Sequence, residues 1–106
     1  QTRDFVFVDD LCRAVLAALT IERDGFDVFN IGSGKETSLK SLLGALRNTI
    51  GDHQYPVRYE EARVGEIYRN YTRITKASSE LGYTPRVSLE EGLEKTWRWF
   101  RQVTEV

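Results

Sequence analysis

The sequence has one cysteine, Cys12, in 106 residues, so no disulfide bond can form within it. A single thiol is typical of proteins from a reducing compartment and predicts a cytoplasmic location. No apolar run approaches the roughly 20 residues that cross a bilayer, so we expect no membrane-spanning helix. The formal net charge is −1, and no stripe of basic and aromatic residues runs along the chain. We therefore expect neither nucleic acid nor a membrane as a partner.

The apolar patterns predict one α/β domain of a few short strands packed with about four helices. Consecutive apolar residues predict strands, at residues 4–8, 26–31 and 57–59. Apolar residues spaced by three and four predict helices, at residues 9–20, 39–50, 76–81 and from 89 to at least 100. So few buried strands cannot complete a sheet of their own. We therefore expect this domain to pack against something larger.

Residues that favour helix ends border the expected helices. Polar side chains that accept hydrogen bonds from a first helical turn are expected as N-caps, at Asp9, Thr37 or Ser38, Thr75 and Ser88. Glu91 follows Ser88 by three residues, which is the spacing of a capping box. Gly51 and Gly82 are expected to end the second and third helices.

Several reactive side chains have a plain structural interpretation. Cys12 has no histidine at the spacing of a nucleophile, so we expect it in the core. Asp9 and Asp10 are neighbours at a helix start, where their carboxylates point apart, so we expect no metal or acid–base pair there. His53, the only histidine, is expected in an exposed loop. Residues 62–72, in contrast, are polar and rich in arginine and tyrosine, which indicates a surface or binding loop.

Five segments resemble, in order and at similar spacing, the C-terminal region of extended short-chain dehydrogenases. This is the NAD-dependent epimerase/dehydratase family, which includes nucleotide-sugar epimerases such as UDP-glucose 4-epimerase. The segments are RDFVFVDDL at 3–11, FNIGSG at 29–34, RVGE at 63–66, TKA at 75–77 with LGYTP at 81–85, and VSLEEGL at 87–93. Together they cover nearly the whole chain.

The resemblance implies that residues 1–106 form a single substrate-binding lobe of a longer NAD(P)-dependent enzyme. In this family a Rossmann domain with a glycine-rich loop and a Tyr-x-x-x-Lys pair lies upstream, and neither motif occurs here. We therefore expect no catalytic residue in the lobe, no bound NAD, NADP or metal, and no activity of the lobe alone. The implied partners are the missing N-terminal Rossmann domain and, for the full-length enzyme, a second subunit in a homodimer. Trp99 is expected at one of these contacts.

The same resemblance implies that Arg3 and Arg63 bind the diphosphate of a nucleotide sugar. A guanidinium suits this role because it offers parallel donors and a permanent charge. The residues alone leave open an ion pair between Arg3 and Asp4, or a solvated Arg63. Val64 stands where the family often has proline. The other residues expected to line the substrate cleft are Gln1, Thr2, Tyr59 and Glu66, with Glu61 and Tyr68 as further nucleotide contacts.

The implied function is to position the substrate of a nucleotide-sugar 4-epimerase for hydride transfer at the sugar C4, in the upstream domain. A lobe of a dTDP- or GDP-sugar dehydratase, or of a UDP-glucuronate decarboxylase, fits the same motifs. The residues also leave open a free-standing binding module without catalytic activity.

Overall fold

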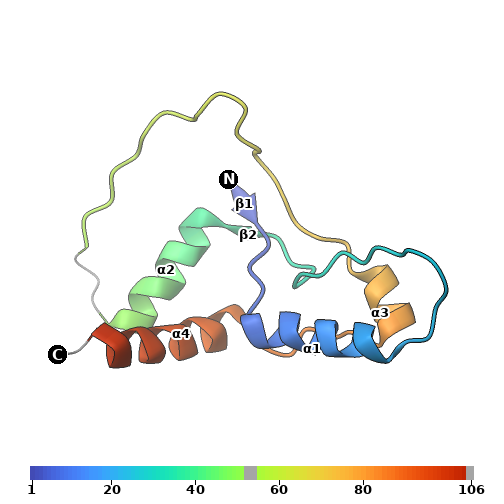
Figure 1. The fold of residues 1–106 in the computed structure, drawn as a ribbon. Coiled ribbons are helices and arrows are strands. Elements are labelled where there is room, and N and C mark those ends of the chain that lie inside the picture. The colour runs from blue at the N-terminus through green and yellow to red at the C-terminus, as the bar shows by residue number, and fades with distance from the viewer. Residues whose placement is uncertain (52–54, 105–106) are drawn as a thin grey trace.

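A computed structural model describes residues 1–51 and 55–104, so His53 lies outside the described residues (Figure 1). The elements are β1 (Thr2–Arg3), α1 (Val8–Thr20), β2 (Thr37–Ser38), α2 (Leu39–Ile50), α3 (Thr75–Leu81) and α4 (Leu89–Thr104). β1 and β2 pair antiparallel, with Thr2 opposite Ser38. The α/β class and the four predicted helices are confirmed within the described ranges.

The helices pack in two pairs, α2 against α4 and α1 against α3. α2 runs from the β1–β2 pair to the C-terminal end of α4 (Figure 1). Residues 55–74 arc over the rest of the chain and form neither helix nor strand. None of the described helices is long and apolar enough to cross a bilayer.

The three predicted strands are wrong. Residues 4–7, 26–31 and 57–59 join no β-ladder, and Val8 already belongs to α1. Apolar, β-branched runs suit a strand, but a strand exists only where a neighbouring chain segment supplies the hydrogen bonds. Residues 26–31 have no such neighbour in the described part of the chain. The observed strands are polar and two residues long, which is too short to show any periodicity.

Residues 26–29 are instead held by side chains of α3 and of the preceding turn. Lys76 Nζ donates to the Val28 carbonyl at 2.7 Å and pairs with the Asp27 carboxylate. The same ammonium lies 4.6 Å from the Phe29 ring centroid, and the Arg23 guanidinium lies 5.4 Å from it. The Lys76 bonds and the two cation–π contacts therefore fix the place of this segment without forming a β-ladder.

The predicted helix ends are right where a local signal decides them. Ser38 Oγ accepts from the Ser41 N–H at 3.0 Å, and Ser88 Oγ accepts from the Glu91 N–H at 3.1 Å. Gly51 and Gly82 follow α2 and α3 with φ of 80° and 67°, the left-handed region that glycine adopts at little cost.

Two predicted N-caps are wrong by one or two residues. α1 begins at Val8 because the Phe7 carbonyl accepts the Asp10 N–H at 3.0 Å, so Asp9 lies inside the first turn. α3 likewise begins at Thr75 itself, after Ile74. Neither helix has a side-chain cap, because the backbone alone starts the first turn.

The core is small. Among the described residues, the buried apolar ones are Ala14, Ala77 and Tyr83, with Phe29, Ile31, Ile74 and Leu81 packed around them. Cys12 is exposed, so its predicted place in the core is wrong; the buried face of α1 is the one that carries Asp10 and Ala14. On α4, Trp97 stacks on Phe100 with ring centroids 5.9 Å apart, and Phe100 itself remains 48% exposed.

The Asp4 carboxylate joins three segments that are far apart in the sequence. It accepts from the Ser33 N–H and hydroxyl at 2.8 and 2.6 Å, the Gly34 N–H at 3.0 Å and the Thr72 N–H at 3.1 Å. Burial raises the pKa of Asp4, but the bonds from Ser33, Thr72 and Gly34 together lower it below the usual 3.8. A Cβ on Gly32 would lie 2.8 Å from this carboxylate and from Thr72, so only glycine fits there.

The Asp10 carboxylate fastens α1 to the segment before α4. It is 1% exposed and accepts from the Arg86 and Val87 N–H groups at 3.0 and 3.1 Å. Arg13, one turn along α1, pairs with it. A buried charge needs such partners, because leaving it without them costs several kcal/mol.

We predict that Asp10→Ala lowers the free energy of unfolding by about 2–4 kcal/mol, since two N–H groups and Arg13 lose their acceptor. Urea denaturation of the full-length protein measures this. Asp9→Ala is the matched control and costs at most about 1 kcal/mol, because Asp9 is exposed in the same helical turn. Equal losses in the two variants would contradict the role of Asp10.

We predict that acid removes the contribution of Asp4. Its pKa is lower in the folded chain than the ordinary 3.8, so the ionised group stabilises the fold above about pH 4 and loses this effect as pH falls through the lowered pKa. The difference in free energy of unfolding between the natural chain and Asp4→Asn should therefore shrink between pH 5 and about pH 2. A difference that stays constant with pH would be inconsistent with ionised Asp4 as the acceptor.

Candidate functional site

The site loop, residues 59–70, is shaped by a tight turn at Arg63–Glu66. The Glu66 N–H donates to the Arg63 carbonyl at 3.1 Å, and Gly65 has a φ of 82°. A positive φ at the third position is typical of a type II turn and favours glycine. The Glu66 carboxylate in turn accepts a hydrogen bond from the Arg63 N–H at 3.0 Å. This closed turn fixes where the Arg63 side chain leaves the backbone.

The first residues of the chain lie between this loop and the start of α2. The Thr2 N–H donates to the Tyr68 carbonyl at 2.9 Å, and the Asn70 N–H donates to the Thr2 carbonyl at 3.2 Å. On the other side, the Leu39 N–H donates to the Gln1 carbonyl at 3.0 Å. Segments that are more than 30 residues apart therefore meet at β1.

Arg3 supports this junction. Its Nη1 donates to the Ile67 carbonyl at 2.8 Å and to the Thr2 carbonyl at 2.6 Å. Asp4, which the sequence left open as its ion-pair partner, instead bonds Ser33, Gly34 and Thr72, as described above. One edge of the Arg3 guanidinium thus holds the site loop.

A pocket of about 800 Å³ opens between the site loop, Gln1 and the first turn of α2. It is lined by Gln1, Ser38, Leu39, Lys40, Tyr59, Glu60, Glu61, Ala62, Arg63, Glu66 and Tyr68. The structure therefore brings together six of the residues expected at the site, which are Gln1, Tyr59, Glu61, Arg63, Glu66 and Tyr68. The other two, Thr2 and Arg3, do not line this pocket and lie in the junction beside it.

The pocket combines cations with hydrogen-bonded carboxylates. Within the described part of the chain, the Arg63 guanidinium and the Lys40 ammonium hold no hydrogen bond or ion pair. A hydrogen bond from Gln1, and then the one from the Arg63 N–H, lower the pKa of Glu66, so this carboxylate stays ionised. The charges of Arg63 and Lys40 suit an anionic ligand, and the three carboxylates that line the same pocket suit its hydroxyl groups.

Lys40 was missed from the sequence. A lysine one position into a helix looks like an ordinary exposed residue, and only the contact between Leu39 and Gln1 brings it to the pocket. Glu36 was missed too. Its carboxylate accepts from the Thr2 hydroxyl at 2.8 Å and from Arg69 Nε and Nη2 at 2.6 and 2.7 Å. Arg69, and then Thr2, lower the pKa of Glu36 from 4.5 to about 2.

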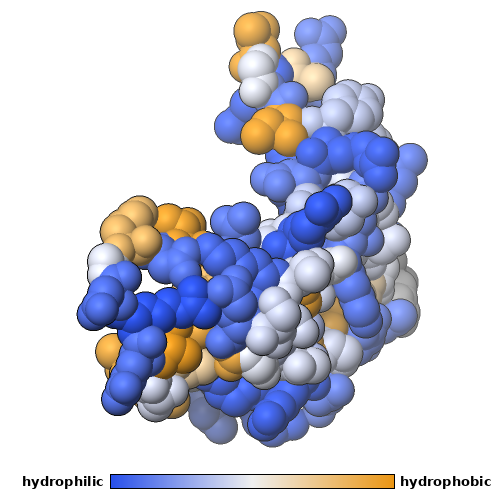
Figure 2. Space-filling view, turned by 90° about the vertical axis from the view of Figure 1, so that its right-hand side faces the viewer, coloured by the Kyte–Doolittle hydropathy of each residue, from blue (hydrophilic) through white to orange (hydrophobic). Residues whose placement is uncertain are grey.

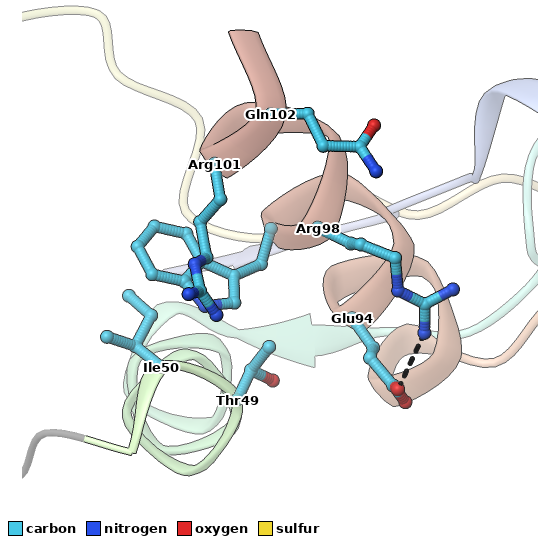
Figure 3. A pocket seen from close by; sticks show the side chains of 7 residues that line it. Thr49, Ile50, Glu94, Arg98, Arg101 and Gln102 are labelled. Carbon is cyan, nitrogen blue, oxygen red and sulfur yellow. Dashed lines mark hydrogen bonds and ion pairs between the residues drawn. The ribbon is translucent and has the colours of Figure 1, made fainter. Parts of the chain in front are cut away.

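A second pocket, of about 440 Å³, lies between the C-terminal ends of α2 and α4 (Figure 3). Thr49 and Ile50 of α2 line one side, and on the side of α4 Glu94 pairs with Arg98 at 3.0 Å. Trp97 of α4 also lines this pocket. None of the predicted site residues lies there. We therefore take the pocket beside the site loop as the candidate functional site.

Proteins of known sequence and structure resemble this chain over nearly all of its length. The UDP-glucose 4-epimerase of Mycolicibacterium smegmatis is 36% identical over 105 residues, which are 99% of this chain and 33% of that protein. The crystal structure of the Thermotoga maritima UDP-glucose 4-epimerase with UDP-glucose matches 98% of this chain at 40% identity, with a TM-score of 0.88. That match covers 33% of the Thermotoga chain.

A third match is the UDP-glucuronic acid 4-epimerase of Bacillus cereus, solved with UDP-glucuronic acid and NAD. It is 33% identical, has a TM-score of 0.87, and covers 97% of this chain and 33% of that one. The chain thus spans about one third of the length of the relatives it matches. The family model described as GDP-mannose 4,6 dehydratase matches residues 1–96, so the chain belongs to this family of NAD-dependent epimerases and dehydratases.

Proposed function

We propose that residues 1–106 form the nucleotide-sugar-binding lobe of an NAD(P)-dependent nucleotide-sugar 4-epimerase. The lobe holds the substrate diphosphate while the sugar C4 reacts in a separate domain. The observation that carries this proposal is the gathering of Gln1, Tyr59, Arg63 and Glu66 around one pocket. Gln1 is the first residue of the chain and the other three lie within residues 59–66, and the pocket that they line also contains Lys40.

The pocket offers each part of a nucleotide sugar a suitable group. Arg63 provides paired N–H donors and a permanent charge for the phosphate oxygens. Arg3 uses Nη1 for backbone carbonyls, which leaves its other donors for the same diphosphate. The rings of Tyr59 and Tyr68 present faces for a base, and Glu66 presents a carboxylate for hydroxyl groups.

NAD(P) would supply the hydride chemistry of such an enzyme, and this chain does not fit that cofactor. It has no glycine-rich phosphate loop and no Tyr-x-x-x-Lys pair. The lobe therefore contributes binding energy: contacts to the remote diphosphate orient the reacting sugar. A dTDP- or GDP-sugar dehydratase or a UDP-glucuronate decarboxylase needs the same contacts. The matching family model, described as a dehydratase, favours keeping that alternative.

Exposed apolar surface supports a missing partner domain. Phe26 is 91% exposed, and α1 exposes Val15, Leu16 and Leu19. Hydrophobic side chains stand among hydrophilic ones on the face shown in Figure 2. Several large apolar side chains left exposed in this way favour burial against another surface. A Rossmann domain would provide that surface, and Trp99, 59% exposed on α4, would contact that domain or a second subunit.

The length of the natural polypeptide tests the lobe assignment. Peptide mapping of the protein from its source cells should find these residues in a chain about three times as long, with a glycine-rich loop and a Tyr-x-x-x-Lys pair before them. A natural chain of about 106 residues would overturn the proposal and favour a free-standing binding module.

We predict that Arg63→Ala raises the KM for UDP-glucose at least tenfold in the full-length enzyme, because one charge-assisted contact of about 1.4 kcal/mol is lost. Steady-state kinetics measure this effect. Arg98→Ala is the matched control: Arg98 is an arginine of α4 that pairs with Glu94, is 64% exposed in its side chain and does not line the pocket beside the site loop. Its KM should stay within twofold. An unchanged KM in Arg63→Ala would remove Arg63 from the site.

A further inference from the structure

The Glu36 carboxylate is shared between two segments that border the candidate site. One of its oxygens accepts from both Thr2 Oγ1 and Arg69 Nε, at 2.8 and 2.6 Å. The other accepts from Arg69 Nη2 at 2.7 Å. Arg69 therefore binds Glu36 through two parallel donors, the geometry in which an arginine fixes both position and orientation.

The residues around Arg69 carry the contacts that hold the site loop. Tyr68 precedes it, lines the pocket and accepts the Thr2 N–H through its carbonyl. Asn70 follows it and donates to the Thr2 carbonyl. Ile67, two residues earlier, accepts from Arg3. The Glu36–Arg69 bridge thus adds a further contact that holds this part of the loop against β1.

The tip of the loop has fewer attachments. The Arg63–Glu66 turn closes on itself through the hydrogen bond from the Arg63 N–H to the Glu66 carboxylate, and interaction with Gln1 lowers the pKa of that carboxylate. Earlier in the segment, Arg47 Nη2 holds the Tyr55 carbonyl at 2.9 Å. The position of Arg63 over the pocket therefore depends on how firmly residues 67–70 are held.

We propose that Glu36 is a positioning residue of the nucleotide-sugar site: its bridge to Arg69 and Thr2 holds the site loop so that Arg63 and Tyr68 face the pocket. This inference rests on the proposed function and deepens it. The bridge is not a general support of the fold, because the Arg69 side chain is 68% exposed, and ion pairs this open add little to overall stability. Its effect is local order in the loop.

The bridge persists over the whole pH range in which such an enzyme is assayed. Glu36 has a pKa of about 2, so it is ionised from mildly acidic to alkaline pH. The loop is then held without any proton change. A change of pH in this range therefore does not break the bridge, and the closing experiment uses a substitution on each side of it.

The experiment compares Glu36→Gln, Arg69→Ala and the double variant in the full-length enzyme. We expect each single variant to raise the KM for UDP-glucose about fivefold and to leave kcat within twofold. Amide hydrogen exchange at residues 63–70 should become faster in both. The double variant should resemble the single ones, because either change already breaks the same bridge. A variant that carries Glu36→Arg and Arg69→Glu together can form the ion pair again. Its KM should therefore lie between the KM of the single variants and that of the natural enzyme.

Glu94→Gln is the matched control, since it breaks the exposed Glu94–Arg98 pair on α4, away from the site loop. It should change neither KM nor exchange in the loop. Two results in Glu36→Gln would overturn the inference: unchanged amide exchange at residues 63–70, or faster exchange with an unchanged KM. A raised KM in Arg63→Ala would still support the proposed function in either case. An unchanged KM in Arg63→Ala would overturn the proposed function, and this inference with it.

Discussion

The carboxylate of Asp4 is the interaction on which the arrangement of the site depends. It accepts hydrogen bonds from the backbone of Ser33 and Gly34, in the connection between α1 and β2, and of Thr72, in the connection between α2 and α3. Gly32 packs against the same carboxylate, and its carbonyl accepts the buried Tyr83 hydroxyl at 2.6 Å. The small apolar core and the polar junction thus share one backbone segment. The fold is held at this point by hydrogen bonds more than by apolar volume.

Two adjacent residues near the start of the chain form hydrogen bonds to different segments. Asp4 points to the glycine turn, and Arg3 points to the carbonyls of the site loop. The loop is therefore supported along residues 67–72, and its tip at Arg63 projects over the pocket. In a binding surface of this kind, hydrogen bonds hold the two ends of a loop, and a cation at the tip of the loop can bind an anion.

The sequence predicted the helices and most of their ends because those signals are local. Ser38, Ser88, Gly51 and Gly82 act within one helical turn of their own positions. Strands failed because pairing depends on segments far away: residues 26–31 have the composition of a strand and find no neighbour among the described residues.

Two neighbouring aspartates show again that local sequence signals do not decide long-range contacts. Asp9 and Asp10 have equal local preferences, and only the contact with residues 86–87 decides that Asp10 is the buried one. The pocket residues Arg63 and Glu66 were found through a family motif, whereas Lys40 was not, because nothing near it in sequence distinguishes it from an ordinary surface lysine.

The pocket is assembled from residue 1, residues 38–40 and residues 59–68. Closing the loops between these segments costs chain entropy before any contact across them can form. Such non-local contacts form late when a chain folds, so the pocket exists only once the surrounding structure is complete. A molecule that bridges the pocket then binds the folded chain alone, and by mass action it shifts the folding equilibrium toward that state. A ligand of the pocket would in this way stabilise the folded chain, and the chain would be least protected against unfolding when that ligand is scarce.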